Sequence, residues 1–183
     1  MIAQFVEKTR QHWKYRHAPV KAPKPDIDDY PIVTSEILRF ADTDQNGHIS
    51  NAVFSVFCQN ARMSLLNDST RIAIPPGHLL PIVKMNIEFL AELHWPGTVE
   101  IGTRFNHVGR SSIGLDQVIF NPKRCVATAR STIVLIDQET RRPAALPPPM
   151  IEQIRLLLCD EPKPVTRKIG FEWFVKVPHS GRK

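Results

Sequence analysis

The chain has 183 residues, the size of one ordinary domain, so we expect a single compact core. Hydrophobic residues make up 42% of the chain and charged residues 23%, a balance that argues against disorder over most of its length. No apolar run approaches the roughly 20 residues that cross a bilayer, so we expect no membrane span. The three cysteines, Cys58, Cys125 and Cys159, are widely spaced, which argues against a disulfide framework and against a cysteine-based zinc site.

The formal net charge of +6 attracts polyanions, and nucleic acid and coenzyme A are both of that kind. The basic residues gather mainly at the two termini rather than in a groove among aromatics, so we expect no nucleic-acid partner. Residues 161–183 hold six Lys or Arg against two acids, and we interpret them as a basic, solubilising tail. The N-terminus lacks the apolar core of a secretory signal, so we expect a cytoplasmic protein; its basic character keeps a mitochondrial location as the alternative.

Prolines interrupt regular structure in residues 1–30, which we interpret as an N-terminal extension. Residues 32–40 have β-branched character and predict a first strand. Ser50 suits a helix N-cap, and the helix after it should end near Asn67. Its buried stripe, spaced by three and four residues, is predicted to be Val53, Val56, Phe57, Ala61 and Leu65.

Residues 83–89 alternate between apolar and polar side chains, which is the period of a strand. Turn residues divide the following chain into three more predicted strands, 99–105, 112–120 and 126–137, and a short helix at 151–157. The order predicts an α+β fold in residues 31–160, with an antiparallel sheet of about five strands wrapped around one long helix. One helix cannot cover both the sheet and its open edge, so we expect a dimer that joins edges.

The polar loop at residues 42–50, Asp-Thr-Asp-Gln-Asn-Gly-His-Ile-Ser, has the spacing that begins a calcium-binding EF-hand loop. That loop also needs a bidentate Glu, and the corresponding position is Val53. The segment before the loop is strand-like, where an EF-hand needs a helix. We therefore expect no calcium and no other metal here.

The same loop resembles the signature of the 4-hydroxybenzoyl-CoA thioesterase family, which has the hot-dog fold. Residues 39–54 and the later pair Ala61-Arg62 carry this resemblance. The family typically shows an aspartate, a Gly-His-Val, an Asn-Asn pair and an aromatic, and then Ala-Arg. The spacing of Asp44, Asn46 and His48 is also similar to that of plant acyl-carrier-protein thioesterases.

Three further segments match the family in the right order, namely residues 89–101, 108–112 and 127–147, so the resemblance spans about residues 32–158. There are departures from the family pattern. Gln59 and Asn60 stand where acidic residues commonly precede Ala-Arg, so a role for a second carboxylate on that helix is absent. Ser50 replaces the first Asn of the usual pair.

The resemblance implies a thioesterase of fatty acid metabolism that converts acyl-CoA, or an acyl carrier protein thioester, to the free acid. Asp44 would be the catalytic carboxylate, either as nucleophile or as general base toward water. The backbone N–H groups at the helix start, near Ser50 and Asn51, would polarise the thioester carbonyl. No cofactor is expected, because coenzyme A is part of the substrate.

The remaining site residues have supporting roles in this interpretation. Asn46 and His48 would orient Asp44 or the water, and Gly47 permits the tight turn into the helix. Val53 and Phe57 would line the acyl tunnel as well as the core. The resemblance suggests that the turn with Arg110, Ser111 and Ser112 contacts the coenzyme, and an ordinary solvent-facing hairpin is the alternative for this turn.

Several alternatives stay open on the sequence alone. Asp42 is interpreted as a turn-forming or capping carboxylate rather than a catalytic one. The main competing function is a non-catalytic hot-dog protein that binds acyl-CoA, since a fold does not fix a function. A homodimer and a homotetramer both fit, and the acyl chain length is not predicted.

Overall fold

The structure is a computed structural model, and it describes residues 25–122 and 124–158. The predicted basic tail and residues 1–24 of the predicted extension lie outside the described residues. A single compact unit, Pro25–Glu161, contains everything described below. Its elements are η1 (Ile27–Asp29), β1 (Ile32–Ile37), η2 (Phe40–Asp42), α2 (Asn51–Leu66), β2 (His78–Leu79), β3 (Ile82–Phe89), β4 (Thr98–Val108), β5 (Ser112–Asn121), β6 (Arg124–Val134), β7 (Ile136–Asp137) and α3 (Pro148–Arg155).

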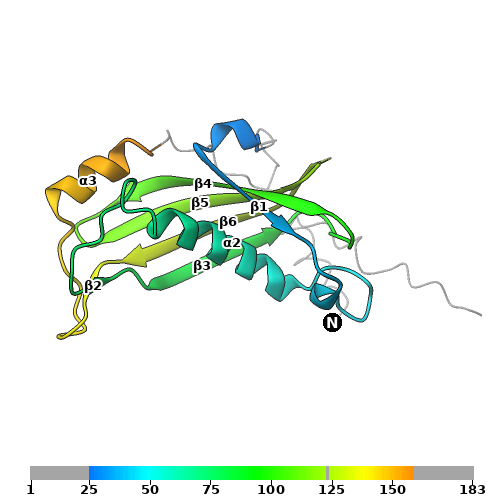
Figure 1. Ribbon diagram of the computed structural model, residues 1–183, viewed down its shortest axis with the longest axis horizontal. Helices are drawn as coiled ribbons and strands as arrows, with labels where there is room; N and C mark the ends of the chain where they lie inside the picture. The colour runs from blue at the N-terminus through cyan, green and yellow to red at the C-terminus, as the bar shows by residue number, and fades with distance from the viewer. Residues whose placement is uncertain (1–24, 123, 159–183) are drawn as a thin grey trace, which may run out of the picture. The chain divides into compact units, whose positions relative to one another are not determined.

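Five of the strands form one antiparallel sheet in the order β1-β4-β5-β6-β3 (Figure 1). The strands from β4 to β6 are successive hairpin neighbours, whereas β3 crosses to the far edge and pairs with β6. β1 pairs with β4 at the other edge. The predicted α+β fold, with about five strands and one long helix, is confirmed.

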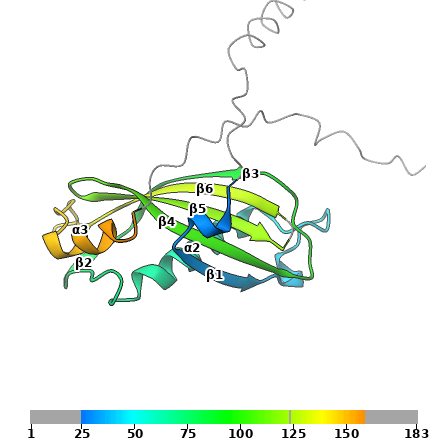
Figure 2. The ribbon, with the colours of Figure 1, turned by 90° about the horizontal axis from the view of Figure 1, so that it is seen from above.

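The long helix α2 lies across one face of the sheet (Figures 1 and 2). Ser50 occupies the predicted N-cap position, and the helix ends at Leu66, one residue before the predicted end. The predicted buried stripe is wrong at Val56, whose side chain is 42% exposed. The helix turns about 100° per residue, so the face that meets the sheet passes through other positions. Its buried members are Phe54, Phe57, Cys58, Ala61, Arg62, Leu65 and Leu66.

Several elements end where local hydrogen bonds change the backbone direction. β1 stops at Ile37 rather than residue 40, because Leu38 N–H donates to Gly97 O and residues 40–42 turn as a 3-10 helix. The predicted last strand divides into β6 and the short β7, which pairs with the unpredicted β2. α3 starts three residues earlier than predicted, at Pro148, and proline suits the first turn of a helix.

The outer face of the sheet is partly covered by the residues around η1. Tyr30 is buried against Gly102, where an added Cβ would lie 2.8 Å from the Tyr30 ring. The Arg104 guanidinium lies over the same ring, 4.5 Å from its centre, and burial raises the Tyr30 pKa to about 12. Residues 25–30, which we predicted to belong to the N-terminal extension, therefore pack on β4.

None of the helices in the described part of the chain is long and apolar enough to cross a membrane.

Candidate active site

The loop that precedes α2 is closed by its own backbone. Thr43 and Ile49 pair as an antiparallel bridge, and Asp44 N–H donates to His48 O at 2.8 Å. Gly47 N–H donates to Asp44 O at 3.0 Å, which completes a tight turn. Gly47 has a φ of +75°, a conformation that strains any residue with a Cβ. The position therefore requires glycine for the turn itself.

The Asp44 carboxylate is held inside this turn by main-chain donors. Its Oδ1 accepts the N–H of Asn46 at 2.8 Å and the N–H of His48 at 3.2 Å. These hydrogen bonds, the Asn46 bond first, hold the Asp44 pKa below its ordinary value. The side chain is exposed, so the site presents a fixed, ionised carboxylate to solvent at neutral pH.

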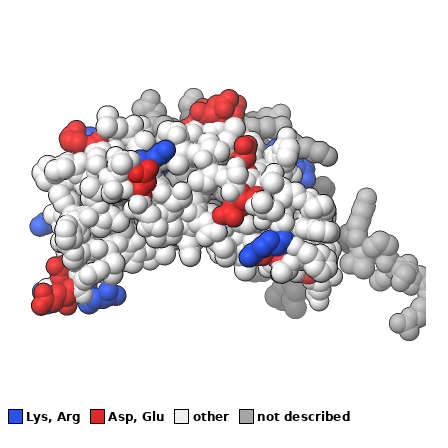
Figure 3. Space-filling model, viewed as in Figure 1, with Lys and Arg blue, Asp and Glu red and all other residues white. Residues whose placement is uncertain are grey.

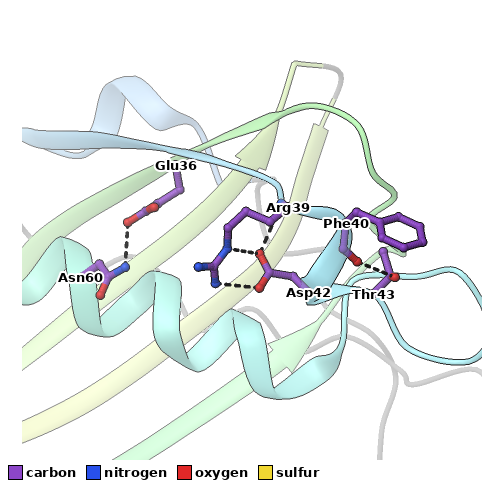
Figure 4. A network of polar contacts seen from close by, with 6 residues as sticks. All are labelled: Glu36, Arg39, Phe40, Asp42, Thr43 and Asn60. Atoms are coloured by element: carbon purple, nitrogen blue, oxygen red, sulfur yellow. Dashed lines mark hydrogen bonds and ion pairs between the residues drawn. The ribbon is translucent and has the colours of Figure 1, made fainter.

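Asp42, two residues earlier, has a structural role. Its buried carboxylate receives two hydrogen bonds from the Arg39 guanidinium, Nη2 to Oδ1 at 2.7 Å and Nε to Oδ2 at 2.9 Å (Figure 4). The Arg39 side-chain hydrogen bonds lower the Asp42 pKa. Asp42 O also accepts Ser50 N–H at 2.9 Å. The carboxylate thus anchors the start of the loop, and the carbonyl fixes the start of the helix.

The N-terminus of α2 begins directly after the loop. Ser50 makes no side-chain cap hydrogen bond, and Asn51, the first helical residue, is exposed. The first N–H groups of a helix have no intrahelical acceptor and carry partial positive charge. The 16-residue α2 therefore contributes polar N–H groups within a few residues of Asp44.

His48 belongs to a second cluster that the sequence did not predict. Its Nε2 lies 3.8 Å from Oε2 of Glu92, and Nε2 of His94 lies 3.7 Å from the same oxygen. The two imidazole rings meet edge to face, with 4.8 Å between their centres. Glu92 and His94 are distant in the sequence, so no local motif links them to His48. His48 donates its main-chain N–H to Asp44, and this hydrogen bond does not involve the imidazole.

The predicted substrate-binding residues are distributed over the fold. Phe57 is fully within the core, and the half-buried Val53 packs against that same core. The turn with Arg110, Ser111 and Ser112 follows β4, whereas the loop with Asp44 lies near the start of β4, where Leu38 bonds Gly97. The 11 residues of β4 span about 35 Å, so a single chain does not bring this turn to Asp44.

Comparison with known proteins identifies the family of the chain. The sequence pattern of the thioesterase-like superfamily matches residues 38–154, more than half of the chain. The match includes the loop with Asp44, all of α2 and the five-stranded sheet except β1.

Solved structures agree with the hot-dog fold. The PA5185 protein of Pseudomonas aeruginosa is 23% identical, with a TM-score of 0.67 over 74% of this chain and 97% of that one. Slr0204, a 1,4-dihydroxy-2-naphthoyl-CoA thioesterase from Synechocystis, is 23% identical, with a TM-score of 0.59 over 68% and 95%. A predicted thioesterase from Bacillus stearothermophilus is 20% identical, with a TM-score of 0.63 over 71% and 98%. At these identities the likeness establishes the fold alone.

Proposed function

Since the chain belongs to the thioesterase-like superfamily, we propose that it hydrolyses acyl-CoA thioesters to coenzyme A and a free carboxylic acid. One observation carries the proposal: the Asp44 carboxylate, ionised and fixed by two main-chain N–H groups, lies just before the N-terminus of α2. A thioester carbonyl needs an attacking group and a stabiliser for the oxyanion. This arrangement supplies a candidate for each.

The carboxylate can act in two ways. As general base it takes a proton from water, and the resulting hydroxide attacks the carbonyl carbon. As nucleophile it attacks the same carbon, and water then hydrolyses the mixed anhydride. In both routes the C–S bond breaks and coenzyme A leaves as thiolate, which takes up a proton. The N–H groups at the start of α2 would stabilise the tetrahedral oxyanion, by about 3 kcal/mol for a well-aimed donor.

A second copy of the chain is part of the proposal, because β3 is an incompletely covered edge strand. α2 packs chiefly against β1 and β4, at the edge of the sheet opposite to β3. Met85 and Ile87 of β3 pack against the core, whereas Phe89, which meets Phe54 of α2, and Val83, at a register shift in the strand, remain exposed. On the face seen in Figures 1 and 3, the margin of the molecule along β3 is hollowed and shows few charged side chains. Pairing of two β3 strands would cover both the backbone edge and this apolar row.

Such a dimer would also bring the predicted site residues nearer to one another. Phe89 pairs with Ala127 near the Asp44 end of the sheet, and Ile82 pairs with Ile133 near the Arg110 end. A two-fold axis through the middle of β3 exchanges these ends. The partner's Arg110 would then lie at the same end of the joined sheet as Asp44, where it could contact the coenzyme.

The test is a substrate panel with a thiol-trapping reagent. Purified full-length protein is given short-chain, long-chain and aromatic acyl-CoAs, and the same acyl groups on acyl carrier protein. We expect the coenzyme A thioesters to release thiol and free acid in equal amounts, and the carrier-protein series shows whether the site also accepts that carrier. If no thioester in the panel is cleaved but acyl-CoA still binds, the non-catalytic binding function replaces this proposal.

A further inference from the structure

We propose that His48, Glu92 and His94 form a binding site for a single divalent transition-metal ion of the zinc class. Two imidazole Nε2 atoms converge on one carboxylate oxygen, at 3.8 and 3.7 Å. One ligand atom from each of the three side chains lies within 4.8 Å of the others. The site is independent of the proposed hydrolysis and would stand if the chain had another activity.

The spacing is close to what a tetrahedral zinc site requires. With ligand distances of roughly 2.0–2.2 Å, neighbouring ligand atoms lie about 3.4 Å apart. Both nitrogen-to-oxygen distances are within about half an ångström of that value, and all three ligand atoms lie within 4.8 Å of one another, so side-chain rotations that bring the two imidazoles together would complete the site. Two His and one Glu leave a fourth position for water, and the partial exposure of all three side chains keeps that position open to solvent.

The backbone holds the two contributing segments together. Ile49 N–H donates to Leu93 O at 2.7 Å, so the residues next to His48, Glu92 and His94 are directly bonded. Ile49 and Leu93 are both buried in the core beneath α2. Leu93 is buried, whereas its two neighbours Glu92 and His94 are exposed and lie beside His48 at the surface. The ligands lie in loop segments outside the strands and helices, and the buried residues Ile49 and Leu93 hold these two segments together.

The donor set selects the class of ion. Imidazole nitrogens favour zinc and its transition-metal neighbours, whereas calcium and magnesium prefer sites made of oxygen. Asp44, which suggested a calcium loop in the sequence, is not a member of the cluster. The competing explanation is that Glu92 simply pairs with one protonated histidine, with no metal involved.

A zinc titration distinguishes these explanations. Untagged full-length protein is titrated with Zn²⁺ in competition with a chromogenic chelator, and melting temperatures are recorded with and without the ion. We expect one equivalent to bind at the site and to raise the melting temperature, since an ion that binds only the folded state stabilises it. Ca²⁺ and Mg²⁺ should do neither.

Each of His48→Gln, Glu92→Gln and His94→Gln should weaken binding at least about tenfold and abolish the thermal shift. The matched controls are His78→Gln and His107→Gln, which alter histidines outside the cluster and should bind zinc as the wild type does. All five side chains are at least partly exposed, so the variants should fold. Absence of zinc binding in the wild type, or equal binding by the Glu92 and His94 variants, would overturn the proposal.

Discussion

Asp44→Asn is expected to slow thiol release from acyl-CoA by about 10²–10⁴-fold, the range over which a positioned acid or base contributes to catalysis. The amide oxygen of asparagine can still accept the N–H groups of Asn46 and His48, so the turn should keep its shape. What the substitution removes is the negative charge, which both proposed routes require. Initial rates at saturating and at low acyl-CoA would show the loss in kcat as well as in kcat/KM.

Asp68→Asn is the matched control for this experiment. Asp68 follows the opposite end of α2, its Oδ1 accepts the N–H of Thr70 at 3.0 Å, and hydrogen bonds from Thr70 lower its pKa. It is therefore a turn-capping carboxylate like Asp44, but outside the proposed site. We expect near wild-type rates from Asp68→Asn. If both variants were equally impaired, the defect would reflect lost turn stability, and the catalytic assignment of Asp44 would fail.

Val83→Lys is expected to convert the proposed dimer to a monomer and to reduce activity with it. Val83 is 60% exposed, at the register shift of the edge strand β3, along which the proposed partner strand would pair. An unpaired ammonium group in an apolar interface costs several kcal/mol, so association should weaken by about 100-fold or more. Sedimentation or light scattering across a concentration series would measure the change.

The other edge of the sheet provides a control of the same chemistry. Val33 in β1 is 47% exposed, and Val33→Lys places the same charge on the edge that the proposed dimer does not use. We expect this variant to remain a dimer and to keep its activity. A Val83→Lys protein that stays dimeric, or a wild type that is monomeric at assay concentration, would refute pairing through β3.

Local sequence patterns predicted most of the fold because they report local physics. The alternation of residues 83–89 corresponds to β3, and Ser50 does lie at the start of α2. The error at Val56 arose because spacings of three and four fit more than one stripe on a helix. Which stripe is buried depends on how the helix lies against the sheet, and that is a tertiary property.

The candidate site also has a part that the sequence could predict and a part that it could not. The turn at Asp44 was predictable because aspartate, asparagine and glycine have strong local turn preferences. The pairing of β3 with β6 was not predictable, because the alternation of apolar and polar residues identifies a strand but not the strand it pairs with. For the same reason the sequence could not bring Glu92 and His94 to His48, because a bond between distant segments, Ile49 to Leu93, makes that contact.

Chemical rescue asks whether catalysis needs a carboxylate at position 44. Asp44→Ala protein is assayed for thiol release with increasing formate, a small carboxylate that can enter the space left by the side chain. We expect a very slow enzyme whose rate rises with formate, while the wild-type rate does not. An Asp44→Ala enzyme that equals the wild type without formate would contradict this expectation.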